Sequence, residues 1–122
     1  MTCRRNDLPV PDKRIPIVVF DLDGTLAVSR WPRRREVGPP ILEGVEILRH
    51  YADAGYRCEI YTARPEADYG AIWDWVRAWH LPVDAVTCGK VFGGLYIDDR
   101  AYCPEYTKRQ PPVRLALDEE VA

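Results

Sequence analysis

The chain has 122 residues and a mass of 14.0 kDa, which is the size of one domain. Apolar residues make up 47% and charged residues 30%, and the net charge is −2. This balance excludes a disordered acidic protein, a collagen-like chain and a polybasic nucleic-acid binder. The longest apolar run, 15–20, contains a proline and is far shorter than the roughly 20 residues that span a bilayer. We therefore expect a cytoplasmic protein without a membrane partner.

The four cysteines are spaced without any CxxC pair, at Cys3, Cys58, Cys88 and Cys103. Two of them stand in apolar runs, where a free thiol behaves as a small buried hydrophobe. The pattern predicts reduced thiols rather than disulfides or a zinc site.

The first part of the chain contains an arm, a strand and a long loop. Residues 1–14 are polar and carry two prolines, which predicts a flexible N-terminal arm. Residues 15–21 (IPIVVFD) are continuously apolar up to the aspartate, as in a parallel strand that is covered on both faces. An Asp-Gly turn follows, and residues 26–40, named the flap here, form a loop with three consecutive arginines.

Helices and strands alternate through the rest of the chain. Apolar residues recur at helical spacing from 41 to 52 and again from 67 to 79, with Gly55 placed to end the first helix and Pro82 the second. Apolar and β-branched runs predict strands at 56–61, 84–88 and 94–98. A weak alternation at 113–117 suggests an edge strand, and residues 118–122 form an acidic tail.

This order predicts an α/β fold of the Rossmann-like type. We expect a three-layer sandwich with a mostly parallel sheet of four to five strands, in a single domain over 15–117. In such a sheet, ligands bind at the carboxyl ends of the strands.

Each predicted strand ends in polar or small residues, so these side chains should converge at one edge of the sheet. In chain order they are Asp21 and Asp23, then Thr62-Ala63-Arg64, then Cys88-Gly89-Lys90, then Asp98-Asp99-Arg100. Several carboxylates this close repel one another unless a cation lies among them, and oxygen ligands favour Mg²⁺. Mg²⁺ beside a lysine and a hydroxyl forms a receptor for a phosphoryl group. The residues alone therefore predict a magnesium-dependent phosphoryl-transfer site.

The same residues resemble the four motifs of the haloacid dehalogenase superfamily. VVFDLDGTLA is similar to the first motif, DxDGT after a hydrophobic strand, and IYTAR is similar to the second. Lys90 stands eight residues before Asp98, as the lysine of the third motif does, and IDDR resembles the fourth. The resemblance covers roughly 15–102, with the motifs in the right order.

The resemblance assigns a role to each matching residue. It implies that Asp21 is the nucleophile that forms an aspartyl-phosphate and that Asp23 is the general acid and base. Thr62 would bind a phosphate oxygen, and Lys90 would pair with the nucleophile and the phosphate. Mg²⁺ would take the carboxylates of Asp21 and Asp98 and the backbone carbonyl of Asp23, with Asp99 as an outer ligand or an orienting group.

Members of the superfamily usually carry a cap domain over the site. Here 36 residues separate Thr25 from Thr62 and 27 separate Thr62 from Lys90, which one loop and the predicted elements use up. The chain therefore resembles the capless (C0-type) phosphatase branch, including small bacterial and phage-encoded members. The resemblance implies that the protein would act on phosphate monoesters, and we expect a monomer or a homodimer.

Without a cap, substrate selection falls to the flap and its surroundings. Candidate substrate contacts are Trp31, Arg33, Arg34, Arg35 and Arg64. A nucleoside monophosphate or similar small phosphometabolite is the favoured substrate. One alternative is a 3′-phosphatase acting on nucleic-acid ends, since DGTLA and IDDR also resemble the phosphatase domain of phage polynucleotide kinase. Another is a catalytically idle module that binds phosphate or a partner.

Structural roles remain open for several of these residues. Asp23 can belong to a simple Asp-Gly turn, Thr62 can cap the following helix, and Lys90 can be a solvated loop lysine. The three arginines of the flap can form a solvated face, and Trp31 can pack against the domain.

Overall fold

The computed structural model describes residues 8–29 and 36–109. Residues 1–7, the first half of the predicted N-terminal arm, lie outside these residues. Trp31, the three arginines of the flap, the predicted edge strand 113–117 and the tail 118–122 also lie outside them.

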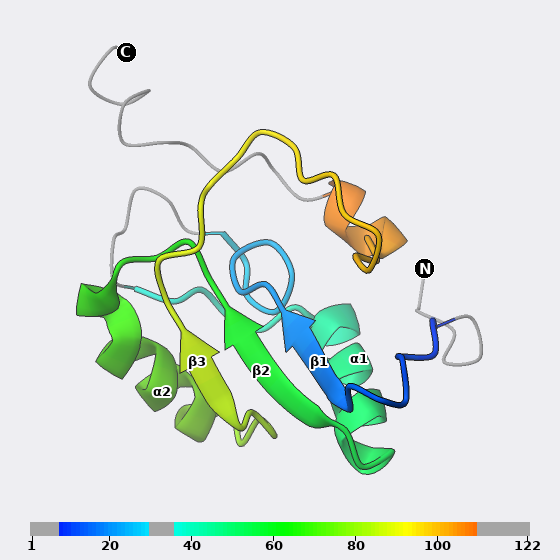
Figure 1. Ribbon diagram of the computed structural model, residues 1–122. Coiled ribbons are helices and arrows are strands. Elements are labelled where there is room, and N and C mark those ends of the chain that lie inside the picture. Colours follow the sequence, from blue (N-terminus) through cyan, green and yellow to red (C-terminus); the bar gives the residue numbers. More distant parts are fainter. Residues whose placement is uncertain (1–7, 30–35, 110–122) are drawn as a thin grey trace.

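The described chain forms an α/β fold around a small parallel sheet (Figure 1). The strands are β1 (Ile17–Phe20), β2 (Arg57–Tyr61) and β3 (Ala85–Thr87), in the order β1-β2-β3. Helix α1 (Leu42–Asp53) connects β1 to β2, and helix α2 (Tyr69–Ala78) connects β2 to β3. Two short 3₁₀ helices complete the set, η2 (Glu66–Asp68) and η3 (Glu105–Arg109).

The sheet has three strands in the described residues, so the prediction of four to five strands is wrong there. The apolar run 94–98 forms no strand, and its side chains are exposed, with Leu95 at 77% and Ile97 at 93%. A strand needs a partner edge for its backbone N–H and C=O groups, and this segment has none among the described residues. It instead arches over the carboxyl ends of the strands (Figure 1).

Both helices cover the same face of the sheet, because each crossover is right-handed and the strands follow in sequence order (Figure 1). Phe20, Cys58, Ile60 and Val86 are buried on that face. The strands alternate between buried and exposed residues, and Val19 is 56% exposed. The expectation that the first strand is covered on both faces, within three layers, is therefore wrong for the described residues, which form two layers.

The core lies between the sheet and the helices and reaches into the turn after β1. Its largest fully buried apolar side chains are Leu22, Leu26, Leu48, Ile60, Ile72 and Cys58. Gly44 lets α1 approach that turn closely, since a Cβ atom there would lie 2.0 Å from the Thr25 carbonyl oxygen. The Tyr106 hydroxyl donates to the same oxygen at 2.9 Å. The core therefore holds the loop that follows β1 in one position.

The two ends of the flap are also tied to the domain. Residues Ala27 and Pro40 form an antiparallel bridge, and the Ile41 N–H donates to the Leu26 carbonyl at 2.8 Å. On the α2 side, the buried Trp75 Nε1–H donates to the Gly38 carbonyl at 2.8 Å. The flap thus leaves and rejoins the domain beside the carboxyl end of β1.

Several smaller predictions can be compared with this fold. Gly55 ends α1 in the left-handed region with φ +94°, as its position predicted. Cys58 and Cys88 are buried free thiols, as expected, whereas Cys103 is exposed. Among the described residues, no helix has both the length and the apolar character needed to cross a membrane.

Candidate active site

The candidate site lies where the three strands end. Phe20 pairs with Ile60 in the sheet, so Asp21 and Thr62 follow neighbouring strands. Backbone hydrogen bonds of 2.9 Å then join the ends of β2 and β3, from the Thr62 N–H to Thr87 and from the Lys90 N–H to Thr62. The parallel sheet thereby brings Asp21, Thr62 and Lys90 to one edge, as the sequence predicted.

Asp21 is a half-buried carboxyl group in this edge. Burial raises its pKa, and the positive charge of Lys90 and a hydrogen bond from the Leu22 N–H act in the opposite direction. The neighbouring negative charge of Asp23 adds to the rise. Lys90 therefore acts electrostatically on Asp21, and the net effect leaves the Asp21 carboxylate with its charge incompletely compensated.

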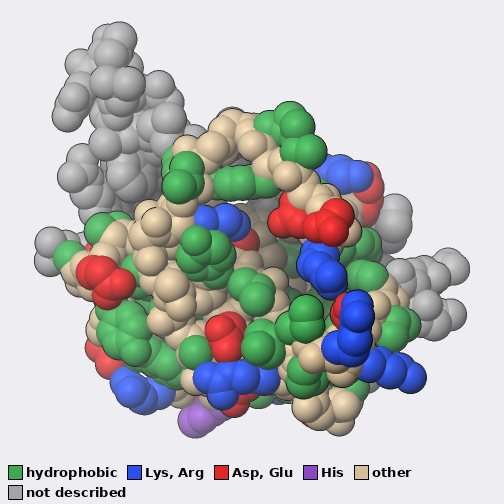
Figure 2. Space-filling view, viewed as in Figure 1, with side chains coloured by type: hydrophobic (Ala, Val, Ile, Leu, Met, Phe, Trp, Pro, Cys, Tyr) green, Lys and Arg blue, Asp and Glu red, His purple; other side chains and the backbone are tan. Residues whose placement is uncertain are grey.

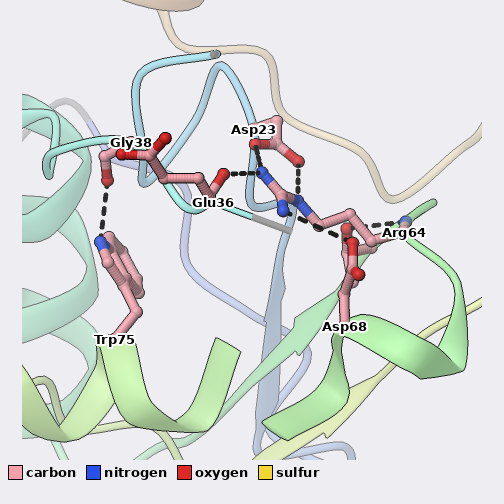
Figure 3. Close-up of polar contacts among 7 residues, drawn as sticks. Asp23, Glu36, Gly38, Arg64, Asp68 and Trp75 are labelled. Atoms are coloured by element: carbon pink, nitrogen blue, oxygen red, sulfur yellow. Dashed lines mark hydrogen bonds and ion pairs between the residues drawn. The ribbon is translucent and has the colours of Figure 1, made fainter. Parts of the chain in front are cut away.

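Asp23 is held by Arg64 in a two-pronged ion pair (Figure 3). Arg64 Nε donates to one carboxylate oxygen and Nη2 to the other, each at 2.8 Å. The same Nη2 donates to the Glu36 carbonyl at 2.9 Å, which links the pair to the end of the flap. The hydrogen bonds to Asp23 raise the pKa of Arg64 above its ordinary value. The sequence had assigned Arg64 to the substrate, whereas here it binds the predicted acid and base.

Asp68 is a residue of the site that the sequence analysis missed. Its carboxylate is buried in η2 and lies 3.5 Å from Arg64 Nη1, on the opposite side of the guanidinium from Asp23 (Figure 3). No spacing along the chain signals this contact, because Arg64 precedes Pro65 and lies before the first turn of η2. Asp68 and Asp23 together fix the plane of the guanidinium.

Thr62 is buried, and its hydroxyl oxygen accepts a hydrogen bond from the Arg64 N–H at 3.1 Å. The hydroxyl proton remains available as a donor toward an anion at the strand end. Lys90 is half-buried, and its Nζ lies over the rings of Tyr61 and Tyr96. These two residues supply a neutral donor and a cation beside Asp21.

The two aspartates of the fourth predicted motif differ from the residues at this edge in their exposure to solvent. Asp98 and Asp99 are exposed, and the Asp98 carboxylate accepts the N–H of Arg100 at 2.8 Å. Among residues 8–29 and 36–109, no group of three His, Cys, Asp or Glu side chains is placed to hold a metal ion. The predicted magnesium site uses two carboxylates and one backbone carbonyl rather than three such side chains, so it stays a prediction.

The described residues leave the space above the strand ends open to solvent. Figure 2 shows the molecule hollowed beneath the arching segment, with basic and acidic side chains near the rim. A small anionic ligand can therefore reach the strand ends without the opening of a domain.

Comparison with known proteins gives one similar structure to report. No protein-family model matches the chain, and no curated protein matches it either. The crystal structure of a target protein from Vibrio cholerae is similar, with 30% sequence identity and a TM-score of 0.62, over 86% of this chain and 94% of that one. The two chains belong to one family. That protein is described by its source alone, so the similarity supports the α/β fold, and the resemblance to the haloacid dehalogenase superfamily stays a prediction.

Proposed function

We propose that the protein is a phosphomonoesterase of the capless haloacid dehalogenase type, with Asp21 as the nucleophile. The observation that carries the proposal is the placement of a half-buried Asp21 at the end of β1, under the influence of the Lys90 charge. Thr62 and the Asp23–Arg64 pair lie at the same edge of the sheet. A carboxylate, a cation and a hydroxyl in this setting suit attack on a phosphoryl group.

The reaction would proceed in two steps. An Asp21 carboxylate oxygen forms a bond to phosphorus as the bond from phosphorus to the leaving oxygen breaks, and the leaving oxygen takes a proton. Water then attacks the same phosphorus atom, gives up a proton, and releases Asp21 and inorganic phosphate. Lys90 and the Thr62 hydroxyl would stabilise the phosphoryl oxygens in both steps.

Asp23 is arranged for the second step in particular. Both of its oxygens accept hydrogen bonds from Arg64, which is the bonding pattern of an ionised carboxylate. An ionised carboxylate can take the proton from water as a general base. To donate a proton to the leaving group in the first step, Asp23 would have to release one of the two Arg64 bonds.

The substrate of this proposal is a small phosphate monoester, with a nucleoside monophosphate favoured. The dependence on Mg²⁺ is a prediction from the sequence resemblance. Assays should therefore compare protein supplied with Mg²⁺ and protein treated with a chelator. Activity that is unchanged by the chelator would contradict the magnesium prediction while leaving the role of Asp21 intact.

The decisive experiment is phosphate release by the Asp21→Asn variant. We expect the parent protein to hydrolyse an aryl phosphate and nucleoside monophosphates, and Asp21→Asn to lose about a thousandfold or more, because the amide cannot form the phospho-intermediate. Asp74→Asn is the matched control, since Asp74 is an exposed acid on α2 with 83% of its side chain accessible. Retention of full activity by Asp21→Asn would refute the proposal.

A second candidate function is phosphate binding without turnover. The observation that favours it is that Asp98 and Asp99 are exposed, whereas Asp21 is half-buried and Thr62 is buried. This candidate predicts binding of inorganic phosphate by calorimetry together with no phosphate release from any monoester. A 3′-phosphorylated oligonucleotide belongs in the same panel, because it tests the nucleic-acid alternative directly.

A further inference from the structure

Two exposed tyrosines flank the lysine of the candidate site. Tyr61 is the last residue of β2, and Tyr96 lies in the segment that arches over the strand ends. The Lys90 Nζ lies 5.6 Å from the centre of the Tyr61 ring and 4.7 Å from the centre of the Tyr96 ring. The two residues are 41% and 48% exposed, so each presents surface to solvent beside the proposed phosphate position.

The Tyr96 ring is held in place by its own loop. Its hydroxyl donates to the Val91 carbonyl at 2.6 Å and accepts the Gly93 N–H at 2.9 Å. The phenol oxygen is thus satisfied locally, and the ring position does not depend on burial. A ring that is already fixed loses little conformational freedom when a ligand packs against it.

Two buried aromatic residues have structural roles that Tyr61 and Tyr96 lack. Trp75 and Tyr106 are buried and tie the flap and η3 to the domain through hydrogen bonds. Tyr61 instead stands on the open face of the sheet, and Tyr96 stands outside the core. An exposed aromatic ring can stack against a planar ring of a ligand, and a neighbouring cation attracts an anionic group of the same ligand.

We propose that Tyr61 and Tyr96 form an aromatic wall that binds a planar ring on the leaving group of the substrate. The inference rests on the proposed function, because it takes the phosphate to lie among Asp21, Thr62 and Lys90. A phosphate held there has its leaving group directed away from the buried strand ends, toward solvent and the two rings. The substrate class is therefore a phosphate monoester with a heteroaromatic ring, such as a nucleoside monophosphate, in preference to a sugar or alkyl phosphate.

The wall can be tested by binding, independently of turnover. Two probes share the sugar phosphate and differ in the ring: adenosine 5′-monophosphate and ribose 5-phosphate. Calorimetry on full-length Asp21→Asn protein should show about tenfold tighter binding of the nucleotide, the size of one base–aromatic contact. Tyr61→Leu or Tyr96→Leu, each added to this background, should remove most of that preference and leave the affinity for ribose 5-phosphate unchanged.

Two further variants separate the wall from a purely structural role. Tyr96→Phe keeps the ring and loses the hydroxyl bonds, so it should retain most of the nucleotide preference. Tyr69→Leu changes a tyrosine of similar exposure, 43%, on α2 and should leave both affinities unchanged. Circular dichroism and thermal melting show whether each variant is folded.

The outcomes distinguish failure of the wall from failure of the proposed function. The wall would be overturned by equal affinity for the two probes or by no binding of either. It would also be overturned if the leucine variants lost affinity equally for both probes, because the rings would then only position Lys90. Absence of phosphate release by the parent protein, with the nucleotide preference intact, would overturn the phosphatase and leave the wall standing. Phosphate release without a nucleotide preference would overturn the wall and leave the phosphatase standing.

Discussion

The end of the sheet and the segment over it, residues 91–103, differ in how their side chains are positioned. At the end of the sheet, Thr62 is 1% exposed, and hydrogen bonds join the chain after β2 to the chain after β3. In the segment, Ile97 is 93% exposed, and Asp98 bonds only to the nearby Arg100 N–H among the contacts described. Side chains that directly follow a paired strand are positioned by the sheet and the core. Side chains in the segment are positioned by local turns.

This difference divides the candidate site. The residues proposed to attack and hold the phosphoryl group belong to the first region, and the two aspartates assigned to the metal by resemblance belong to the second. The first region is therefore organised before a ligand arrives, which lowers the cost of binding and reaction. The following four predictions compare a residue of the organised part of the domain with a matched exposed residue.

The largest difference in stability should separate two isoleucines. Ile60 is 1% exposed in the centre of β2, so Ile60→Ala should lower the free energy of unfolding by about 3 kcal/mol through lost burial and a residual cavity. Ile97→Ala should change it by less than about 0.5 kcal/mol. Urea unfolding measures both values. A comparable loss for Ile97→Ala would show that the segment packs as the strand that the sequence predicted.

The next difference concerns two arginines in ion pairs. Arg64→Gln removes the guanidinium between Asp23 and the buried Asp68 and should cost about 2–3 kcal/mol of stability, because two carboxylates are then left close together. Arg100, which lies 3.6 Å from Asp12 with 60% of its side chain accessible, is the control. Arg100→Gln should cost less than about 0.5 kcal/mol. Equal losses for the two variants would mean that Arg64 is not clamped in solution.

Two glycines in helices should respond in opposite directions. Gly44→Ala places a Cβ atom against the Thr25 carbonyl, so α1 must shift and stability should fall by about 1–3 kcal/mol. Gly70 lies in α2 with nothing within 4 Å of such an atom. Gly70→Ala should therefore raise stability by about 0.5–1 kcal/mol through better helix propensity. Thermal melting of both variants checks the sign, and a stable Gly44→Ala protein would argue against the close approach of α1.

The smallest difference should be one of chemical reactivity, between the thiols of Cys58 and Cys103. Burial, with a further contribution from the charge of Asp84, raises the pKa of Cys58 to about 11. Iodoacetamide at pH 8 should therefore label the exposed Cys103 and leave Cys58 unmodified in the folded protein, as peptide mass mapping can show. The thiol of Cys58 keeps its proton to a higher pH in the folded protein than in the unfolded chain. The free energy of unfolding should therefore fall as pH rises from about 9 toward 11. Rapid labelling of Cys58 at pH 8 would contradict its burial.

Most of the regular structure could be predicted from local sequence. The predicted helices at 41–52 and 67–79 correspond to α1 and α2, and the first three predicted strands to β1, β2 and β3, each within a few residues. Apolar periodicity and terminating glycines act over a single turn or strand, so they are readable without knowledge of the rest of the chain. The run 94–98 looked equally strand-like, but a strand also requires a neighbouring edge, which local sequence does not reveal.

The candidate site could be predicted in part for the same reason. Asp21 and Thr62 follow strands directly and Lys90 lies three residues after β3, and the parallel pairing of β1 and β2 brings the first two to one edge. The Asp23–Arg64 pair joins residues 41 positions apart and depends on the orientation of the turn after β1. Neither the pair nor the part played by Asp68 follows from residue spacing along a strand.

The sequence by itself determined that the chain is one small α/β domain whose strands end in carboxylates, a hydroxyl and a lysine. It did so because strand and helix periods are local properties and because parallel strands share the edge at which they end. Only the tertiary structure decided which of those charges meet, that Arg64 binds Asp23 and that Asp98 and Asp99 are exposed. Those outcomes depend on burial and on contacts between distant segments, which the packing of the sheet, α1 and the arching segment sets together.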